Sequence, residues 1–214
     1  MLRKLLIAIA FSIAFAYIES AVVVYLRVIF HPYGFEFPLG VFGATPLAKR
    51  LLLTEIGREA ATLVLIVTAA WLFASTRQER TAYILVIFAV WDIFYYVWLK
   101  VLLNWPASIM DWDILFLIPC VWASPVLYPA LVSLLMFAFA VAILWRVQAG
   151  KPLLVKASDW VGWSVASVVI VVSFALGGTR VTEPDYATRF YPALFGLGYA
   201  LGVAFAVRAL MRRA

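Results

Sequence analysis

The sequence predicts an all-α protein, a polytopic integral membrane helix bundle of about six transmembrane helices. Hydrophobic residues make up 66% of the chain and charged residues only 13%, whereas a soluble domain is about half apolar and a quarter charged. Apolar runs recur at lengths of about 20 residues, which is what a hydrocarbon core about 30 Å thick requires. Backbone polar groups need partners in lipid, so these runs are expected to be helices. The short alternating segments of a β-barrel are absent.

The expected spans form a single transmembrane domain over residues 1–214, and the apolar stretches set their limits. They are about 5–30, 51–74, 81–103, 125–147, 158–176 and 191–209. The first begins like a secretory signal, but its apolar character continues to Phe30, which favours an uncleaved helix. Prolines interrupt the region before the fourth span, and proline breaks helix hydrogen bonding. A short interfacial or re-entrant segment is therefore expected near Asp113–Pro119.

The distribution of charge predicts the orientation. Of the 17 Lys and Arg residues, ten fall on the side of the N-terminus in this arrangement, and nine of the 11 acidic residues fall in the opposite half or beyond it. Basic residues in short loops stay on the cytoplasmic side. The sequence thus predicts a multi-pass protein of a bacterial-type cytoplasmic (inner) membrane with both termini cytoplasmic.

Composition and motifs exclude several functional classes. The net charge of +6 is spread over short loops and chain ends, so no nucleic-acid surface is expected. Cys120 is a lone cysteine and His31 a lone histidine, which argues against a disulfide, a bis-histidine haem site and a histidine-rich metal site. Nucleotide-binding glycine loops, nucleophile elbows and zinc helices are absent from the sequence. No metal site is expected and no cofactor is identified.

Three carboxylates are expected at one level of the membrane. With a rise of about 1.5 Å per residue, Glu19 lies about 21 Å, Glu59 about 18 Å and Asp92 about 16 Å from the inner edge. An ionisable group near the bilayer centre costs at least a few kcal/mol, and it usually faces the bundle interior and has a function. The alternative is that these side chains form ion pairs and hydrogen bonds that fix helix packing.

A second layer of charged side chains is expected nearer the outer boundary. Its members are Arg27, Glu55, Arg58, Lys100, Asp111 and Asp113. Glu55 and Glu59 are four residues apart on one helix face and repel each other, so they need a proton, a cation or a basic partner. Arg27 is the expected partner of either glutamate, and Lys100 is expected to pair with an aspartate of the rim.

These considerations give a candidate site. Glu19, Glu59 and Asp92 are the candidate catalytic residues. The candidate substrate-binding residues are Arg27, Glu55, Arg58, Trp91, Tyr95, Tyr96 and Lys100. Aromatic faces beside a carboxylate are suited to a hydrophobic ligand or a cationic intermediate, although plain core packing is the favoured explanation of Trp91 and Tyr95.

Three functions compete. The first is an outward-facing intramembrane carboxylate pocket that binds or transforms a lipophilic small molecule; its enzymatic form is an acid-catalysed cyclase or isomerase. The second is a structural or accessory subunit of a larger membrane complex, such as a respiratory or photosynthetic assembly. The third, ranked last, is a proton- or cation-coupled transporter, in which the six helices would form half of a homodimer. The expected partners are the lipid bilayer, a lipophilic ligand, and a homo-oligomer or larger complex.

Overall fold

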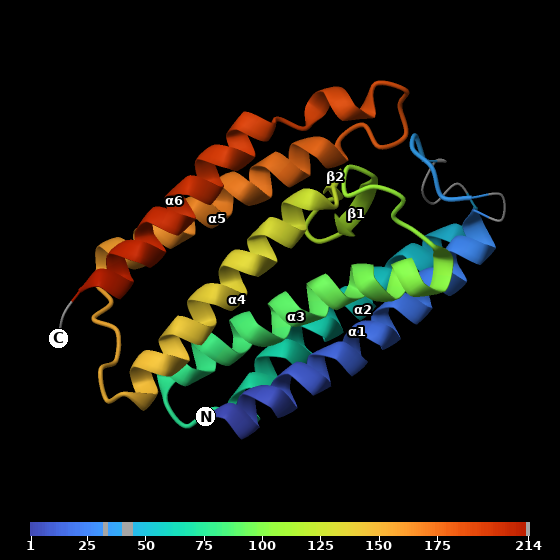
Figure 1. Ribbon diagram of the computed structural model, residues 1–214. Helices are drawn as coiled ribbons and strands as arrows, with labels where there is room; N and C mark the ends of the chain where they lie inside the picture. The colour runs from blue at the N-terminus through green and yellow to red at the C-terminus, as the bar shows by residue number, and fades with distance from the viewer. Residues whose placement is uncertain (32–33, 40–44, 213–214) are drawn as a thin grey trace.

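The computed structural model describes residues 1–31, 34–39 and 45–212, and within them six long helices form the bundle of Figure 1. They are α1 (Leu2–Phe30), α2 (Pro46–Phe73), α3 (Arg77–Leu103), α4 (Leu127–Gln148), α5 (Ala157–Gly178) and α6 (Pro192–Met211). A short 3-10 helix, Tyr186–Arg189, precedes α6. All six long helices have the length and composition needed to cross a membrane. The predicted all-α polytopic bundle is confirmed.

Two helices begin earlier than their apolar stretches, because polar residues form their first turns. The Thr45 side chain accepts the Ala48 N–H ahead of Pro46. Thr76 and Glu79 form a capping box at the start of α3, in which the side chain of each residue accepts the backbone N–H of the other. Such caps satisfy N–H groups that have no partner within the helix. Hydropathy therefore located the spans but not the first turns of these helices.

The segment expected before the fourth helix is a β-hairpin. Strand β1 (Trp112–Phe116) pairs antiparallel with β2 (Trp122–Pro125), and Asp113 lies opposite Ser124. Pro119 in the connection and Pro125 at the end disfavour a helix here. The aromatic and β-branched residues of both segments suit an extended conformation. The hairpin lies at the end of the bundle away from both chain termini (Figure 1).

The hairpin rests directly on the end of α5. A Cβ atom on Gly177 would collide with the Ala123 carbonyl oxygen, and one on Gly178 with the Val121 carbonyl oxygen. Only residues without a side chain permit this approach of backbone to backbone. The two glycines thus place β2 at a fixed position over α5.

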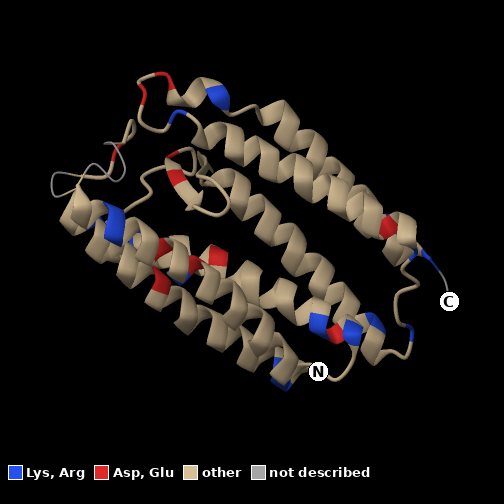
Figure 2. Ribbon diagram, turned by 180° about the vertical axis from the view of Figure 1, so that it is seen from behind, with Lys and Arg blue, Asp and Glu red and all other residues tan. Residues whose placement is uncertain are grey.

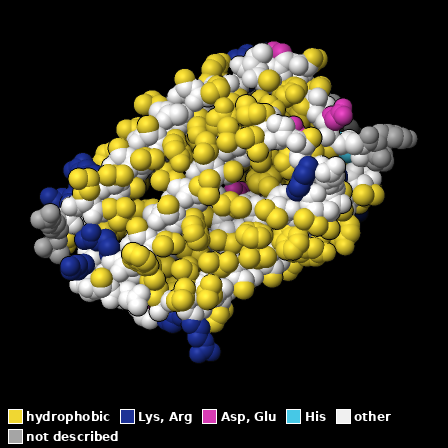
Figure 3. All heavy atoms as spheres, in the orientation of Figure 1, with side chains coloured by type: hydrophobic (Ala, Val, Ile, Leu, Met, Phe, Trp, Pro, Cys, Tyr) yellow, Lys and Arg dark blue, Asp and Glu magenta, His cyan; other side chains and the backbone are white. Residues whose placement is uncertain are grey.

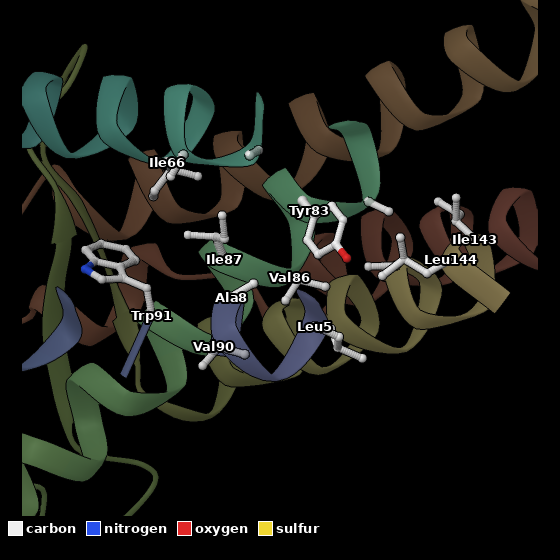
Figure 4. Close-up of a cluster of buried hydrophobic side chains, with 14 of the residues drawn as sticks. Leu5, Ala8, Ile66, Tyr83, Val86, Ile87, Val90, Trp91, Ile143 and Leu144 are labelled. Carbon is white, nitrogen blue, oxygen red and sulfur yellow. The ribbon is translucent and has the colours of Figure 1, made fainter. Parts of the chain in front are cut away.

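Helix α3 lies at the centre of one half of the molecule, packed on α1, α2 and α4, while α5 packs on α6 and on the hairpin. Figure 1 shows α5 and α6 as a pair alongside the other helices. The apolar core joins Leu5 of α1 to Ile66 of α2, Ile87 of α3 and Leu144 of α4 (Figure 4). Fully buried alanines, including Ala8, let these helices approach closely.

The outer surface is apolar over most of the face in Figure 3. Large side chains such as Leu72 (86% exposed), Trp145 (69%) and Val161 (63%) point outward, which a soluble protein rarely tolerates over a large area. Most acidic residues lie in the half of the bundle that holds the hairpin, and basic residues gather at the end that holds the termini (Figure 2).

Candidate functional site

A cavity of about 320 Å³ lies between α1, α2, α3 and β1, in the same half of the molecule as the hairpin. Its volume falls at the lower end of the range for small-molecule sites. Five carboxylates and two arginines line it together with apolar side chains such as Leu26, Phe30, Leu52, Ile114 and Phe116. The polar lining residues are Glu19, Arg27, His31, Glu55, Arg58, Glu59, Thr62, Asp92, Tyr95, Tyr96 and Asp113.

Arg58 binds two of the carboxylates. Its guanidinium forms an ion pair with Glu19 of the neighbouring helix. On its own helix, Arg58 Nη2 lies 2.6 Å from Glu55 Oε2, and Nε donates to the same oxygen at 2.8 Å. The Thr62 hydroxyl adds a hydrogen bond of 3.3 Å to Glu19. This cluster joins α1 to α2 and satisfies both carboxylates.

Arg27 pairs with Asp113 of the hairpin, its Nη2 lying 3.4 Å from Oδ1. Its guanidinium also lies over the rings of Phe35 and Trp105, 4.0 and 3.8 Å from the ring centroids. The expected pairing of Arg27 with Glu55 or Glu59 was therefore wrong. The hairpin folds back between the helices and brings a carboxylate to Arg27 that counting along the helices did not place there.

Glu59 and Asp92 have hydrogen bonds but no ion pair within the described residues. Both carboxylate oxygens of Glu59 accept the Leu117 N–H, at 3.1 and 2.9 Å. Asp92 accepts the Ser133 hydroxyl at 2.7 Å. Glu59 is only 7% exposed. Five carboxylates and two arginines line the cavity, so acidic groups are in excess by three. Glu59 and Asp92 supply two of these, and the third arises because Glu19 and Glu55 share Arg58.

Lys100 lies outside the cavity. Its ammonium donates to the carbonyl oxygens of Asn104 and Pro106, at 3.2 and 3.0 Å. The Asp111 carboxylate instead accepts the N–H groups of Ala107 and Ser108. The expected pairing of Lys100 with an aspartate of the rim was wrong. Each i, i+4 step turns about 40° around a helix, so two steps from Asp92 direct Lys100 away from the cavity.

Sequence reasoning undervalued two residues of the cavity. Asp113 was expected only at the outer rim, yet it is 2% exposed and pairs with Arg27. The bulky apolar neighbours Trp112 and Ile114 were a signal that this carboxylate is buried. His31 was not among the candidate residues, but it lines the cavity. Burial, together with the nearby Arg27 guanidinium, lowers the pKa of His31 and favours the neutral imidazole.

The structure brings Glu19, Glu59 and Asp92 to one cavity, as the depth count expected, and of the other candidate residues only Lys100 is not among its lining. What these residues do chemically stays a prediction. Among the described residues, no group of three or more His, Cys, Asp or Glu side chains is arranged to hold a metal ion. No protein-family model, curated protein or solved structure matches the chain.

Proposed function

We propose that this membrane protein binds a lipophilic small molecule in the cavity between α1, α2, α3 and the hairpin. The observation that carries the proposal is the pair of carboxylates, Glu59 and Asp92, which line the cavity and form no ion pair in the described chain. Charged groups at membrane depth are costly and mark functional sites. Packing alone explains the closed Glu19–Arg58–Glu55 cluster. Packing does not explain why Glu59 and Asp92 also line the cavity.

The cavity also supplies the parts of an acid–base site. A protonated carboxyl group of Asp92 or Glu59 would transfer its proton to an alkene carbon of a bound molecule, and the same carboxylate would take a proton from a neighbouring carbon. Aromatic rings beside the site, such as Trp91, would stabilise the intermediate cation. The product of that cycle is an isomer or a ring-closed form of the substrate. Under the proposed orientation, the cavity faces the outer side of the membrane.

The test is to identify what purifies with the protein. Wild-type protein, Glu59→Gln and Asp92→Asn are purified in mild detergent, extracted with organic solvent and compared by mass spectrometry. Both substitutions keep an oxygen that accepts the Leu117 N–H or the Ser133 hydroxyl, so the fold is preserved. We expect a specific small molecule in the wild type that falls at least tenfold in each variant.

Glu183→Gln is the matched control. Glu183 lies in an exposed loop, 3.3 Å from Arg180, and its substitution leaves the cavity untouched. Retention at the wild-type level is expected in this control. The proposal is overturned if the wild type carries no enriched molecule, or if the two cavity variants retain it as fully as the control does.

A further inference from the structure

A second cavity adjoins the first. It has a volume of about 190 Å³ and lies between α3, α4, α5 and the hairpin. Its walls are largely apolar and include Phe88, Val132, Met136, Ile170, Val171 and Phe174. Asp92, Leu115 and Phe116 line both cavities. Figure 3 shows that the apolar face of the molecule is hollowed, with an acidic side chain visible in the hollow.

Hydrogen-bonding groups lie where the two cavities meet and in the lining on either side. Asp92 supplies carboxylate oxygens and is held by Ser133. The indole N–H groups of Trp91 and Trp122 are buried and have no hydrogen-bond partner among the described residues. Trp91, only 5% exposed, lines the first cavity and Trp122 the second. In Figure 4 the Trp91 nitrogen points away from the apolar core side chains. Acceptor oxygens of Asp92 thus lie at the junction, and the lining of each adjoining cavity includes a tryptophan whose N–H is available as a donor.

The apolar cavity lies beyond this junction. An engineered cavity of about 150 Å³ in another protein binds benzene. A volume of about 190 Å³ therefore admits a segment of about six to eight carbons by the same standard. Because α5 packs chiefly on α6 and the hairpin rather than on α4, we expect the remainder of a longer chain to leave the cavity between α4 and α5.

We infer that the ligand of this site is a lipid alcohol, whose hydroxyl lies at the junction beside Asp92 and whose chain occupies the cavity between α4 and α5. The inference rests on the proposed function and names the ligand class. A hydroxyl group donates to a carboxylate and accepts from an indole N–H at once. An ammonium group only donates, which leaves the indole groups unpaired, and a carboxylate head is repelled by the acidic lining.

The head-group assignment is tested with three probes that share one chain. Farnesol, farnesylamine and farnesoic acid are titrated onto wild-type protein in nanodiscs, and binding to empty nanodiscs is subtracted. We expect farnesol to bind at least tenfold more tightly than either of the other two. Equal or tighter binding of the amine or the acid overturns the assignment. Absence of farnesol binding above the empty nanodiscs overturns it as well.

The chain placement is tested by filling the second cavity. Val171→Trp places a large side chain in it, whereas Val168→Trp adds the same side chain on the outward face of α5, where Val168 is 60% exposed. Farnesol affinity is expected to fall at least tenfold in the first variant and to stay unchanged in the second. Met136→Trp and its outward-facing control Leu134→Trp repeat the comparison on α4. This second pair serves if a variant on α5 fails to fold.

The donor role of Trp91 is tested with Trp91→Phe, which removes the N–H and keeps an aromatic ring. Trp163→Phe is its control, because the Trp163 N–H is also buried without a partner in the described chain but lines neither cavity. A several-fold loss of farnesol affinity is expected in the first variant alone, and equal effects in both contradict the role.

The two proposals fail separately. If farnesol binds equally well to Val171→Trp and to the wild type while Glu59→Gln loses the co-purified molecule, the chain placement is wrong and the proposed function stands. If Glu59→Gln and Asp92→Asn both retain that molecule, the proposed function fails first.

Discussion

The two sides of the bundle are held together by different means. Helices α5 and α6 meet through small residues: a Cβ atom on Gly162 would collide with the Phe205 ring, and one on Gly198 would lie 3.0 Å from the Ala166 carbonyl oxygen. The buried charge of this pair is at one end, where Asp159 pairs with Arg212. Helices α1, α2 and α3 instead carry ion pairs and hydrogen bonds along the cavity between them.

This difference shows that charges at membrane depth are not needed to assemble these helices. Close packing of small residues suffices for α5 and α6, as it does in many membrane bundles. Our proposal of a role beyond packing therefore concerns Glu59 and Asp92, which form no ion pair among the described residues. Substitutions on the two sides of the bundle test this contrast.

Loss of Arg58 is expected to destabilise the protein most. Arg58→Met leaves the buried Glu19 and the partly buried Glu55 without their common cation, and removing one partner of a buried pair costs about 3–5 kcal/mol. Unfolding titrations in mixed micelles measure this loss. Arg180→Met removes a guanidinium that pairs with Glu183 on the exposed surface, and less than about 1 kcal/mol is expected there. Equal losses in the two variants would contradict a structural role for the buried cluster.

A substitution at the contact between α5 and α6 is expected to have the next largest effect on the free energy of unfolding. Gly198→Ala brings a Cβ atom within 2.9 Å of Ile170 Cγ1, and overpacking of this kind costs about 1–3 kcal/mol. A Cβ atom on Gly196, on the same helix, meets no atom within 4 Å. Gly196→Ala is therefore expected to leave the free energy of unfolding unchanged or to raise it by up to about 1 kcal/mol. Thermal unfolding of both variants checks the sign of each change.

The smallest effect is expected for Ser133→Ala. It removes the hydroxyl that donates to Asp92, and a single hydrogen bond contributes about 1 kcal/mol. Ser164→Ala on the exposed side of α5 is the control and should have no measurable effect. If Ser133→Ala matched Arg58→Met in cost, Asp92 would be part of the structural framework of the bundle. The contrast between paired and unpaired carboxylates would then be lost.

The level of the carboxylates was predictable, but their partners were not. Span positions depend on local hydropathy, and the helical rise is fixed, so Glu19, Glu59 and Asp92 were expected at one depth and do line one cavity. Pairing depends on how each helix is rotated and on what lies beside it. The sequence places Arg58 next to Glu59 in the chain, whereas in the structure it binds Glu19 and Glu55.

The hairpin accounts for most of the contacts in the cavity that the sequence did not predict. A short apolar run interrupted by prolines is compatible with helix, strand or loop, so the position of Asp113 relative to α1 had no basis in the sequence. Once the strands form, Asp113 meets Arg27 and the Leu117 N–H meets Glu59. Both contacts are tertiary, and local sequence patterns carry no information about them.

The bond between Glu59 and the Leu117 N–H has a thermodynamic consequence. This N–H belongs to the hairpin connection, and an unpaired backbone donor at membrane depth costs several kcal/mol. A ligand that draws the Glu59 carboxylate away therefore breaks a hydrogen bond that holds the hairpin in place. Coupling between two equilibria is reciprocal, so a change that loosens the hairpin favours that ligand by the same free energy. Under the proposed function, the hairpin and the ligand would compete for one side chain, so the position of the hairpin would depend on whether the cavity is occupied.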